Sequence, residues 1–134
     1  MAANERLVRI GSDTDIIAAR SHGRTLAGEL GFASGDITLI ATAISELARN
    51  ILSYAGEGEI LIRAINGSQH QGILIVASDR GPGIPDLSQA LRDGFSTSGS
   101  LGLGLPGVRR LMDEFEIASE AEQGTTVTVK KWKQ

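Results

Sequence analysis

Residues 79–85 read Asp79-Arg80-Gly81-Pro82-Gly83-Ile84-Pro85, and the apolar run before them, Ile73 to Ala77, predicts a buried strand. Glycine permits positive φ and a close approach of the backbone to a ligand, and proline fixes φ. A strand that ends in a carboxylate and a stiff loop can therefore hold a flat polar ligand. A tight surface turn has the same composition, so this stretch alone leaves both interpretations open.

Composition places the chain among ordinary globular proteins. Its 134 residues, 41% hydrophobic and 22% charged, suit a single domain over residues 1–134. The net charge of −3 gives no electrostatic argument for a nucleic-acid partner. The absence of cysteine excludes disulfides and thiolate metal sites. Residues 1–6 lack an apolar leader, and the longest mostly apolar run, 37–44, is far shorter than the ~20 residues of a membrane helix. We expect a cytoplasmic protein without a membrane partner.

Glycine is concentrated in one window. Of 17 glycines, seven fall between positions 81 and 107: Gly81, Gly83, Gly94, Gly99, Gly102, Gly104 and Gly107. Glycine is costly inside helices and strands. The window therefore predicts a long loop that is either functional or disordered.

Hydrophobic periodicity and turn residues predict an α+β fold. Helices are expected at about 12–30, 34–54 and 105–114, with a short one at 87–92. Strands are expected at 7–10, 59–65, 72–78, 115–119 and 125–132. Short turns between neighbouring strands indicate an antiparallel-rich sheet that is covered on one face by helices.

Two polar residues on the second predicted helix are candidates for chemistry. Glu46 and Asn50 are four apart and share a face, beside the apolar stripe. An amide oxygen is a suitable ligand for Mg²⁺, and a carboxylate one turn away can accept a proton. A pair on a solvated helix edge fits the same spacing. Arg49 can also simply pair with Glu46, which contributes only a few tenths of a kcal/mol.

A second glycine motif runs from Gly102 to Gly107 and matches G-x-G-x-x-G. A Rossmann fingerprint must follow a strand, whereas Phe-Ser-Thr-Ser-Gly-Ser precedes this motif at 95–100. A protein-kinase glycine loop requires a strand lysine and an H-R-D segment, which the chain lacks. What remains is a loop that leads into a helix N-terminus, where free N–H groups favour phosphate. Arg109 and Arg110 either add charge there or form a basic exposed face.

In order along the chain, four motifs resemble those of the GHKL (Bergerat-fold) ATPases and kinases. Glu46-x-x-x-Asn50 resembles the N box, Asp79-x-Gly81-x-Gly83 the G1 box, Gly102-x-Gly104 the G2 box and Gly124-Thr125 the G3 position. The resemblance implies a two-layer α/β sandwich. Its sheet is expected to be mixed and mostly antiparallel, with about three helices on one face.

Within this superfamily, the segments at 44–50, 79–85 and 94–99 are similar to the small serine/threonine kinases of bacterial partner-switching systems, above all the switch kinases of the stressosome. Relatives include the anti-sigma-factor kinases. Histidine kinases usually carry a basic residue soon after the N-box Asn, where this chain has Ile-Leu-Ser-Tyr at 51–54. A phospho-acceptor histidine helix is not visible either.

The resemblance implies transfer of the ATP γ-phosphoryl group to Ser or Thr of STAS-domain proteins, followed by activation of a PP2C-type phosphatase in a general stress sigma-factor pathway. It assigns Glu46 as the general base, Asn50 as the Mg²⁺ ligand and Asp79 as the acceptor for the adenine amino group. Residues 95–104 would form the ATP lid. The implied ATP contacts are Asn50, Asp79, Gly81, Gly83, Ile84, Ser96, Thr97, Ser98, Gly102, Leu103, Gly104, Leu105, Arg109 and Thr125.

Two other functions stay open at this point. One is a nucleotide-dependent, anti-sigma-type binding module with little catalysis, and the other is a detached histidine-kinase catalytic domain. Glu46 favours an enzyme, because a pure binding module does not need a carboxylate at that position.

Overall fold

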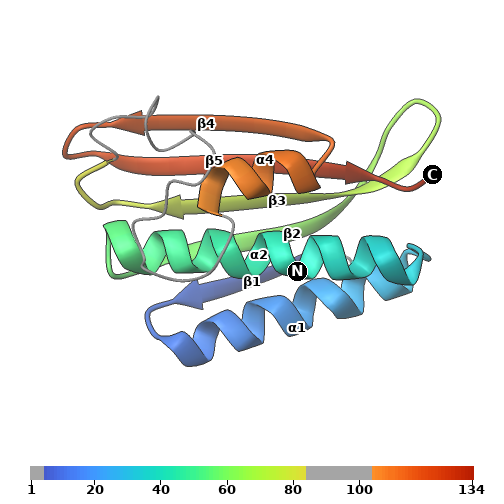
Figure 1. Cartoon of the computed structure of the whole chain (residues 1–134), viewed down its shortest axis with the longest axis horizontal. Helices are drawn as coiled ribbons and strands as arrows, with labels where there is room; N and C mark the ends of the chain where they lie inside the picture. The colour runs from blue at the N-terminus through green and yellow to red at the C-terminus, as the bar shows by residue number, and fades with distance from the viewer. Residues whose placement is uncertain (1–4, 84–103) are drawn as a thin grey trace.

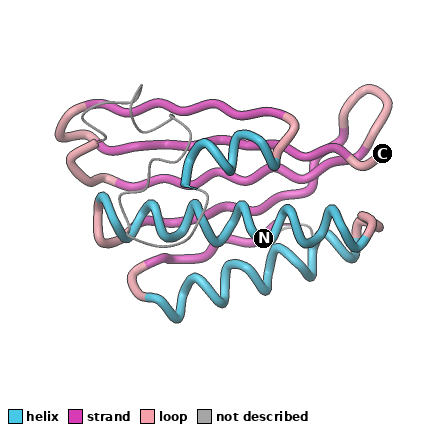
Figure 2. The backbone as a smooth tube through the Cα atoms, in the orientation of Figure 1, coloured by secondary structure: helices cyan, strands magenta, loops and turns pink. Residues whose placement is uncertain are grey.

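The computed structural model describes residues 5–83 and 104–134. Within these ranges a five-stranded sheet carries three helices on one face (Figure 1). The elements are β1 (Glu5–Ile10), α1 (Asp13–Glu29), α2 (Ser34–Tyr54), β2 (Gly58–Asn66), β3 (Gln71–Asp79), α4 (Gly104–Leu111), β4 (Glu114–Glu120) and β5 (Gly124–Trp132). The helices and the sheet form two layers (Figure 2). This is the α+β sandwich that the sequence predicted.

The strand order is β1-β2-β3-β5-β4, and all four pairings between these strands are antiparallel. The expectation of a mixed sheet is therefore corrected within the described strands. The chain reverses direction three times between β1 and β2, at β1–α1, α1–α2 and α2–β2, and this odd number of reversals leaves the neighbouring strands antiparallel (Figure 1). Since β5 lies between β3 and β4, those two strands do not pair with each other.

Glycine and capping residues set the ends of α1. The Asp15 carboxylate accepts hydrogen bonds from the backbone N–H groups of Gly11 and Ser12, at 2.8 and 3.1 Å. This bond from the first turn back to the residue before the helix confirms the predicted start. The helix ends before Gly31, which has φ +85°. The reversal at Gly31 lets α2 return along α1.

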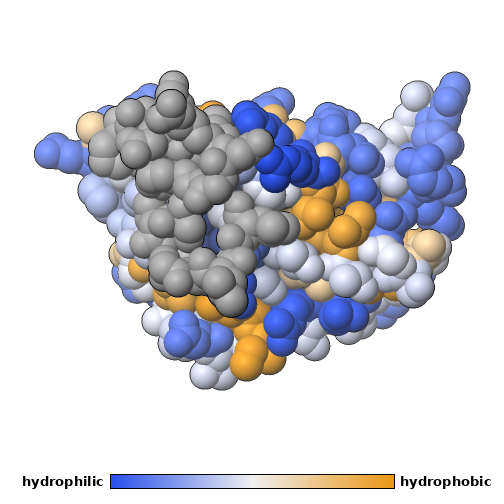
Figure 3. All heavy atoms as spheres, in the orientation of Figure 1, coloured by the Kyte–Doolittle hydropathy of each residue, from blue (hydrophilic) through white to orange (hydrophobic). Residues whose placement is uncertain are grey.

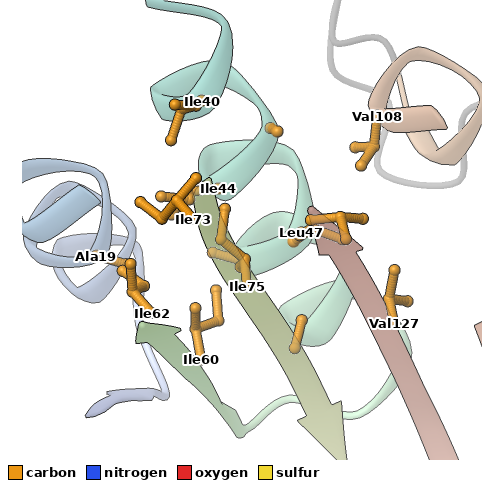
Figure 4. Close-up of a cluster of buried hydrophobic side chains, with 14 of the residues drawn as sticks. Ala19, Ile40, Ile44, Leu47, Ile60, Ile62, Ile73, Ile75, Val108 and Val127 are labelled. Atoms are coloured by element: carbon orange, nitrogen blue, oxygen red, sulfur yellow. The ribbon is translucent and has the colours of Figure 1, made fainter. Parts of the chain in front are cut away.

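The core lies between the helices and the sheet. Ile40, Ile44 and Leu47 of α2 project toward strand residues that alternate along β2, β3 and β5 (Figure 4). These fully buried partners are Ile60, Ile62, Ile73, Ile75, Val127 and Val129. Each such side chain contributes roughly 1.5–3 kcal/mol through burial. The packing therefore fixes α2 over the centre of the sheet.

The other face of the sheet carries no helix among the described residues. Leu7, Leu61 and Val76 are cross-strand neighbours there, and Leu7 is 50% exposed. On the helix-bearing face, charged and polar side chains surround smaller apolar areas (Figure 3). No helix in the described ranges is long and apolar enough to cross a membrane.

One predicted boundary is wrong. The third main helix was expected to reach about residue 114, but α4 ends at Leu111 and β4 begins at Glu114. Asp113 already joins the sheet, because its N–H donates to the Lys130 carbonyl at 2.9 Å and its carboxylate accepts the Trp132 N–H at 2.7 Å. The short helix expected at 87–92 lies outside the described residues.

Candidate functional site

A buried acid and a half-buried amide lie one turn apart on α2. The side chain of Glu46 is only 6% exposed, and Asn50 follows about 6 Å along the helix axis. Arg49 Nη1 lies 3.5 Å from Glu46 Oε1. A buried carboxylate is expensive to desolvate unless it is paired. The position of Glu46 is therefore unlike that of a residue on a solvated helix edge.

A second carboxylate, Asp79, ends β3 and is 9% exposed. Its Oδ1 atom accepts hydrogen bonds from the backbone N–H of Gly81 at 2.9 Å and of Thr125 at 3.3 Å. Both donors come to the same oxygen, which fixes the orientation of the carboxylate. Among residues 5–83 and 104–134, no donor is bonded to Oδ2, so this oxygen can accept from a ligand.

Glycines bring three segments close to Asp79. A Cβ at Gly124, where φ is +110°, would collide with the Asp79 carbonyl oxygen. A Cβ at Gly83 would lie 2.6 Å from the Glu120 carbonyl oxygen, and one at Gly81 would lie 2.8 Å from Ala55 Cα. The loop after β3 therefore packs both on the β4–β5 turn and on the end of α2. This close packing requires glycine at these positions, whereas the sequence predicted glycine here for the approach of a ligand.

The Asp79 loop and Glu46 lie at different heights along α2. Ala55, against which the Asp79 loop packs, comes nine residues after Glu46, or about 13.5 Å along the helix axis. Asn50 lies between them. Figure 1 shows the C-terminal ends of α2 and β3 at the same edge of the molecule. An extended ligand held at Asp79 can thus run along α2 past Asn50 toward Glu46.

Helix α4 offers fewer side chains to a ligand than its glycine motif predicted. Gly104 begins it with φ +62°, but the Leu105 side chain is 4% exposed and belongs to the core. Only the backbone of Leu105 can therefore face a ligand. Arg109 and Arg110 lie in the last turn of this eight-residue helix, so an anion at its N-terminus is more than a turn away from their backbones.

Several predicted contacts cannot be placed. Ile84, Ser96, Thr97, Ser98, Gly102 and Leu103 lie outside the described residues. Of the remaining candidates, the structure brings Asp79, Gly81, Gly83 and Thr125 together at one end of α2.

One residue at this end was missed by the sequence reasoning. Ser119 Oγ lies 2.8 Å from Thr125 Oγ1, so the two hydroxyls share a hydrogen bond. The two residues are opposite each other in the β4–β5 hairpin. The turn predicted at 120–124 contained the signal, since it makes residues 119 and 125 cross-strand neighbours.

Two hollows border the candidate site in the described part of the chain. One, of about 520 Å³, is lined by Asp79 and Arg80 together with Arg9, Glu57, Gly58, Glu59, Ser78 and Thr126. Of these residues, Arg9, Glu59, Ser78 and Thr126 form one cross-strand row on the uncovered sheet face. The other hollow, of about 350 Å³, is lined by Arg20, Arg24, Ala41, Thr42, Ser45 and Arg49. Asn50 lines neither hollow, so neither one extends from Asp79 past Asn50 to Glu46.

The family model described as "Histidine kinase-, DNA gyrase B-, and HSP90-like ATPase" matches residues 35–134, and the chain belongs to this family. The matched range includes α2 from its second residue onward, the Asp79 loop and the β4–β5 hairpin. The family relationship thus covers each element of the candidate site and agrees with the GHKL resemblance of the four sequence motifs.

Individual relatives indicate the class of protein within this family. The serine/threonine-protein kinase RsbT of Bacillus subtilis (strain 168) is 54% identical over 129 residues, which are 96% of this chain and 97% of the relative. An anti-sigma F factor of Bacillus licheniformis is 31% identical over 103 residues, 72% of this chain and 69% of the relative. Family membership together with the 54% identity places the chain among the ATP-dependent protein kinases.

Solved structures agree in fold. The mycobacterial sensor histidine kinase MprB is similar with a TM-score of 0.56 and 15% identity, covering 97% of this chain and 98% of that one. The catalytic domain of the histidine kinase ThkA gives a TM-score of 0.54 at 18% identity, covering 96% of each chain. At such identities the likeness concerns the fold alone.

Proposed function

We propose that the chain transfers the γ-phosphoryl group of ATP to a serine or threonine hydroxyl of a STAS-domain protein. It then changes partner and activates a PP2C-type phosphatase, in a cytoplasmic stressosome pathway that controls a general stress sigma factor. The observation that carries the proposal is the buried Glu46 carboxylate, one turn from Asn50 on the helix against which the Asp79 loop packs. The 54% identity to RsbT supports the hydroxyl acceptor.

The described residues fit a nucleotide with its base at Asp79. Asp79 Oδ2 is available to accept from the adenine amino group, while Gly81 and Thr125 hold Oδ1. Gly83, with φ +83°, allows the base to approach the loop closely. The N-terminus of α4 offers free N–H groups to the phosphates.

Asn50 is the proposed protein ligand for Mg²⁺. Mg²⁺ usually keeps several waters and takes one or two protein oxygens together with substrate phosphates. A half-buried amide beside a single buried carboxylate suits that mode. Among the described residues no three His, Asp or Glu side chains gather into a metal site. When bound, Mg²⁺ neutralises phosphate charge.

Glu46 is the proposed general base. Its carboxylate takes the proton of the acceptor hydroxyl as the hydroxyl oxygen bonds to the γ-phosphorus and the bond from that phosphorus to ADP breaks. Arg49, at 3.5 Å, orients one oxygen of this carboxylate. The reaction otherwise requires the reacting groups to be held in position, and the packing of α2 on the sheet holds Glu46 and Asn50 in place.

A second function is favoured by the 31% identity to an anti-sigma F factor: a nucleotide-dependent binding module with little catalysis. The two functions differ in turnover. A binding module holds its partner while nucleotide is bound, and a kinase releases a modified partner. A detached histidine-kinase domain would instead produce an acid-labile phosphohistidine.

The deciding experiment incubates the chain with γ-labelled ATP and a STAS-domain protein encoded beside it, with Glu46→Gln as the control. We expect label on Ser or Thr of the partner that survives acid, and none with the variant. Acid-labile label would support the histidine-kinase alternative. Stable nucleotide-dependent binding without label would support the binding module.

A further inference from the structure

The hydroxyl pair formed by Ser119 and Thr125 lies beside the proposed adenine site. Ser119 Oγ and Thr125 Oγ1 are 2.8 Å apart, and the Thr125 N–H donates to Asp79 Oδ1 at 3.3 Å. Thr125 is 3% exposed, and Ser119 is half-buried. Thr125 thus connects Ser119 to Asp79 through two hydrogen bonds.

Packing fixes the position of Ser119. A Cβ at Gly83 would lie 3.1 Å from Ser119 Oγ, so the hydroxyl lies against Gly83 of the Asp79 loop. The backbone of Ser119 is paired with Thr125 in the hairpin. Its hydroxyl is therefore held between the loop and β5.

Counting protons shows what the pair can offer. Each hydroxyl has one proton to donate and lone pairs to accept. One proton is used in the bond between the two oxygens. If Ser119 supplies it, the Thr125 proton is left to donate elsewhere; if Thr125 supplies it, Thr125 can only accept.

Adenine and guanine require different states of the Thr125 hydroxyl, because their edges carry different donors and acceptors. Adenine presents an amino donor next to N1, which is an acceptor, whereas guanine presents a carbonyl acceptor next to an N1–H donor. The Asp79 carboxylate can only accept when ionised, so it suits the adenine amino group. A neighbouring donor is then required for adenine N1, and Thr125 is the neighbour that the structure provides.

We propose that Ser119 is a positioning residue that selects adenine. It donates to Thr125 Oγ1 and so directs the Thr125 proton to N1 of the base, directly or through one water. The inference rests on the proposed ATP site and deepens it by adding a specificity residue from β4. Without the Ser119 hydroxyl, the Thr125 hydroxyl is free to rotate. It can then either donate or accept at purine N1, so the site no longer favours adenine through this contact.

The test compares calorimetric binding of ATP and of 1-deaza-ATP, in which N1 is replaced by C–H, to the whole chain. One hydrogen bond corresponds to about fivefold in affinity. The wild type should therefore bind 1-deaza-ATP about fivefold more weakly than ATP. With Ser119→Ala we expect weaker ATP binding, unchanged 1-deaza-ATP binding and a ratio below about twofold.

Two further variants of Ser119 serve as controls. Ser119→Thr keeps the hydroxyl and should keep the wild-type ratio. Ser119→Cys, with a weak donor of similar size, replaces Ser119→Ala if the latter does not fold. An equal loss for both nucleotides would indicate a merely structural role and would overturn the inference.

Asp79→Asn separates this inference from the proposed function. If that variant weakens ATP binding while Ser119→Ala keeps the wild-type ratio, the adenine site stands and the role of Ser119 is rejected. If Asp79→Asn leaves ATP affinity unchanged, the site itself is misplaced.

Discussion

The backbone N–H of Thr125 lies 3.3 Å from Asp79 Oδ1, so a residue of β5 holds a carboxylate that is 46 positions earlier in the chain. The same oxygen accepts from Gly81, two residues after Asp79. One short-range and one long-range hydrogen bond thus fix the orientation of the Asp79 carboxylate. Within the described residues, the other oxygen, Oδ2, accepts no hydrogen bond.

Asp79→Asn is expected to weaken ATP binding at least about tenfold while leaving the fold intact. The amide can place its oxygen where Oδ1 accepts its two bonds, but its NH₂ group then faces the adenine amino group with a donor. Titration calorimetry with ATP measures the loss. Thermal unfolding of the same sample is the control, and equal affinities for variant and wild type would contradict a role in binding the base.

Glu46→Gln is expected to lower the rate of phosphoryl transfer by about 10²–10⁴-fold, because the amide cannot accept the proton of the acceptor hydroxyl. ATP affinity should change little, since Ala55, against which the Asp79 loop packs, lies about 13.5 Å from Glu46 along α2. Single-turnover transfer to the STAS-domain partner separates the two effects. A variant that keeps its rate would exclude Glu46 as the base.

Gly124→Ala is expected to destabilise the fold more than Gly56→Ala does. Both positions have positive φ, at +110° and +80°, and an alanine there costs roughly 1–2 kcal/mol in backbone strain. Only at Gly124 would the new Cβ also collide with the Asp79 carbonyl oxygen; at Gly56 no atom lies within 4 Å. We expect at least about 1 kcal/mol more loss for Gly124→Ala, together with weaker ATP binding.

Urea denaturation of the two glycine variants gives the free energies of unfolding at a common m-value. Equal losses for Gly56→Ala and Gly124→Ala would mean that the β4–β5 turn can move away from Asp79 without cost.

Gly23→Ala and Ile44→Val are expected to compensate for each other. A Cβ at Gly23 would collide with Ile44 Cδ1, the atom that valine lacks. Ile44→Val alone should cost about 0.5–1.5 kcal/mol, and Gly23→Ala alone about 1 kcal/mol net of its helix propensity. The double variant should be more stable than the sum of these losses by at least about 0.5 kcal/mol.

A matched control for this pair lies on the same helix. Gly28→Ala, with nothing within 4 Å of its Cβ, should stabilise by up to about 1 kcal/mol. Strict additivity of Gly23→Ala and Ile44→Val would show that α1 and α2 can separate slightly at this crossing.

The sequence predicted the elements well where a single local signal decides them. The apolar spacing of α2 and the glycine after α1 were sufficient for both helices, and the four-residue interval placed Glu46 and Asn50 on one face. Local patterns do not contain the order of strands. The insertion of β5 between β3 and β4, and with it the contact from Thr125 to Asp79, was therefore missed.

Two other differences have the same origin. The end of α4 was placed too late, because Asp113 leaves the helix to bond with β5, a partner that helix periodicity does not reveal. Leu105 was read as part of a glycine loop around phosphate, yet the packing of α4 places its side chain in the core. In both cases a tertiary partner decides the role of the residue.

The place of β5 also affects the order in which the protein can mature. Although β5 follows all other described elements in the chain, it is the strand that joins β4 to the rest of the sheet. A nascent chain whose synthesis has stopped before Gly124 lacks both the Thr125 bond to Asp79 and the partner of β4. Such a chain retains the sequence of β1 to β3 and of both long helices, but it lacks two contacts that shape the proposed nucleotide site. The site proposed at Asp79 is therefore completed only after β5 has been synthesised.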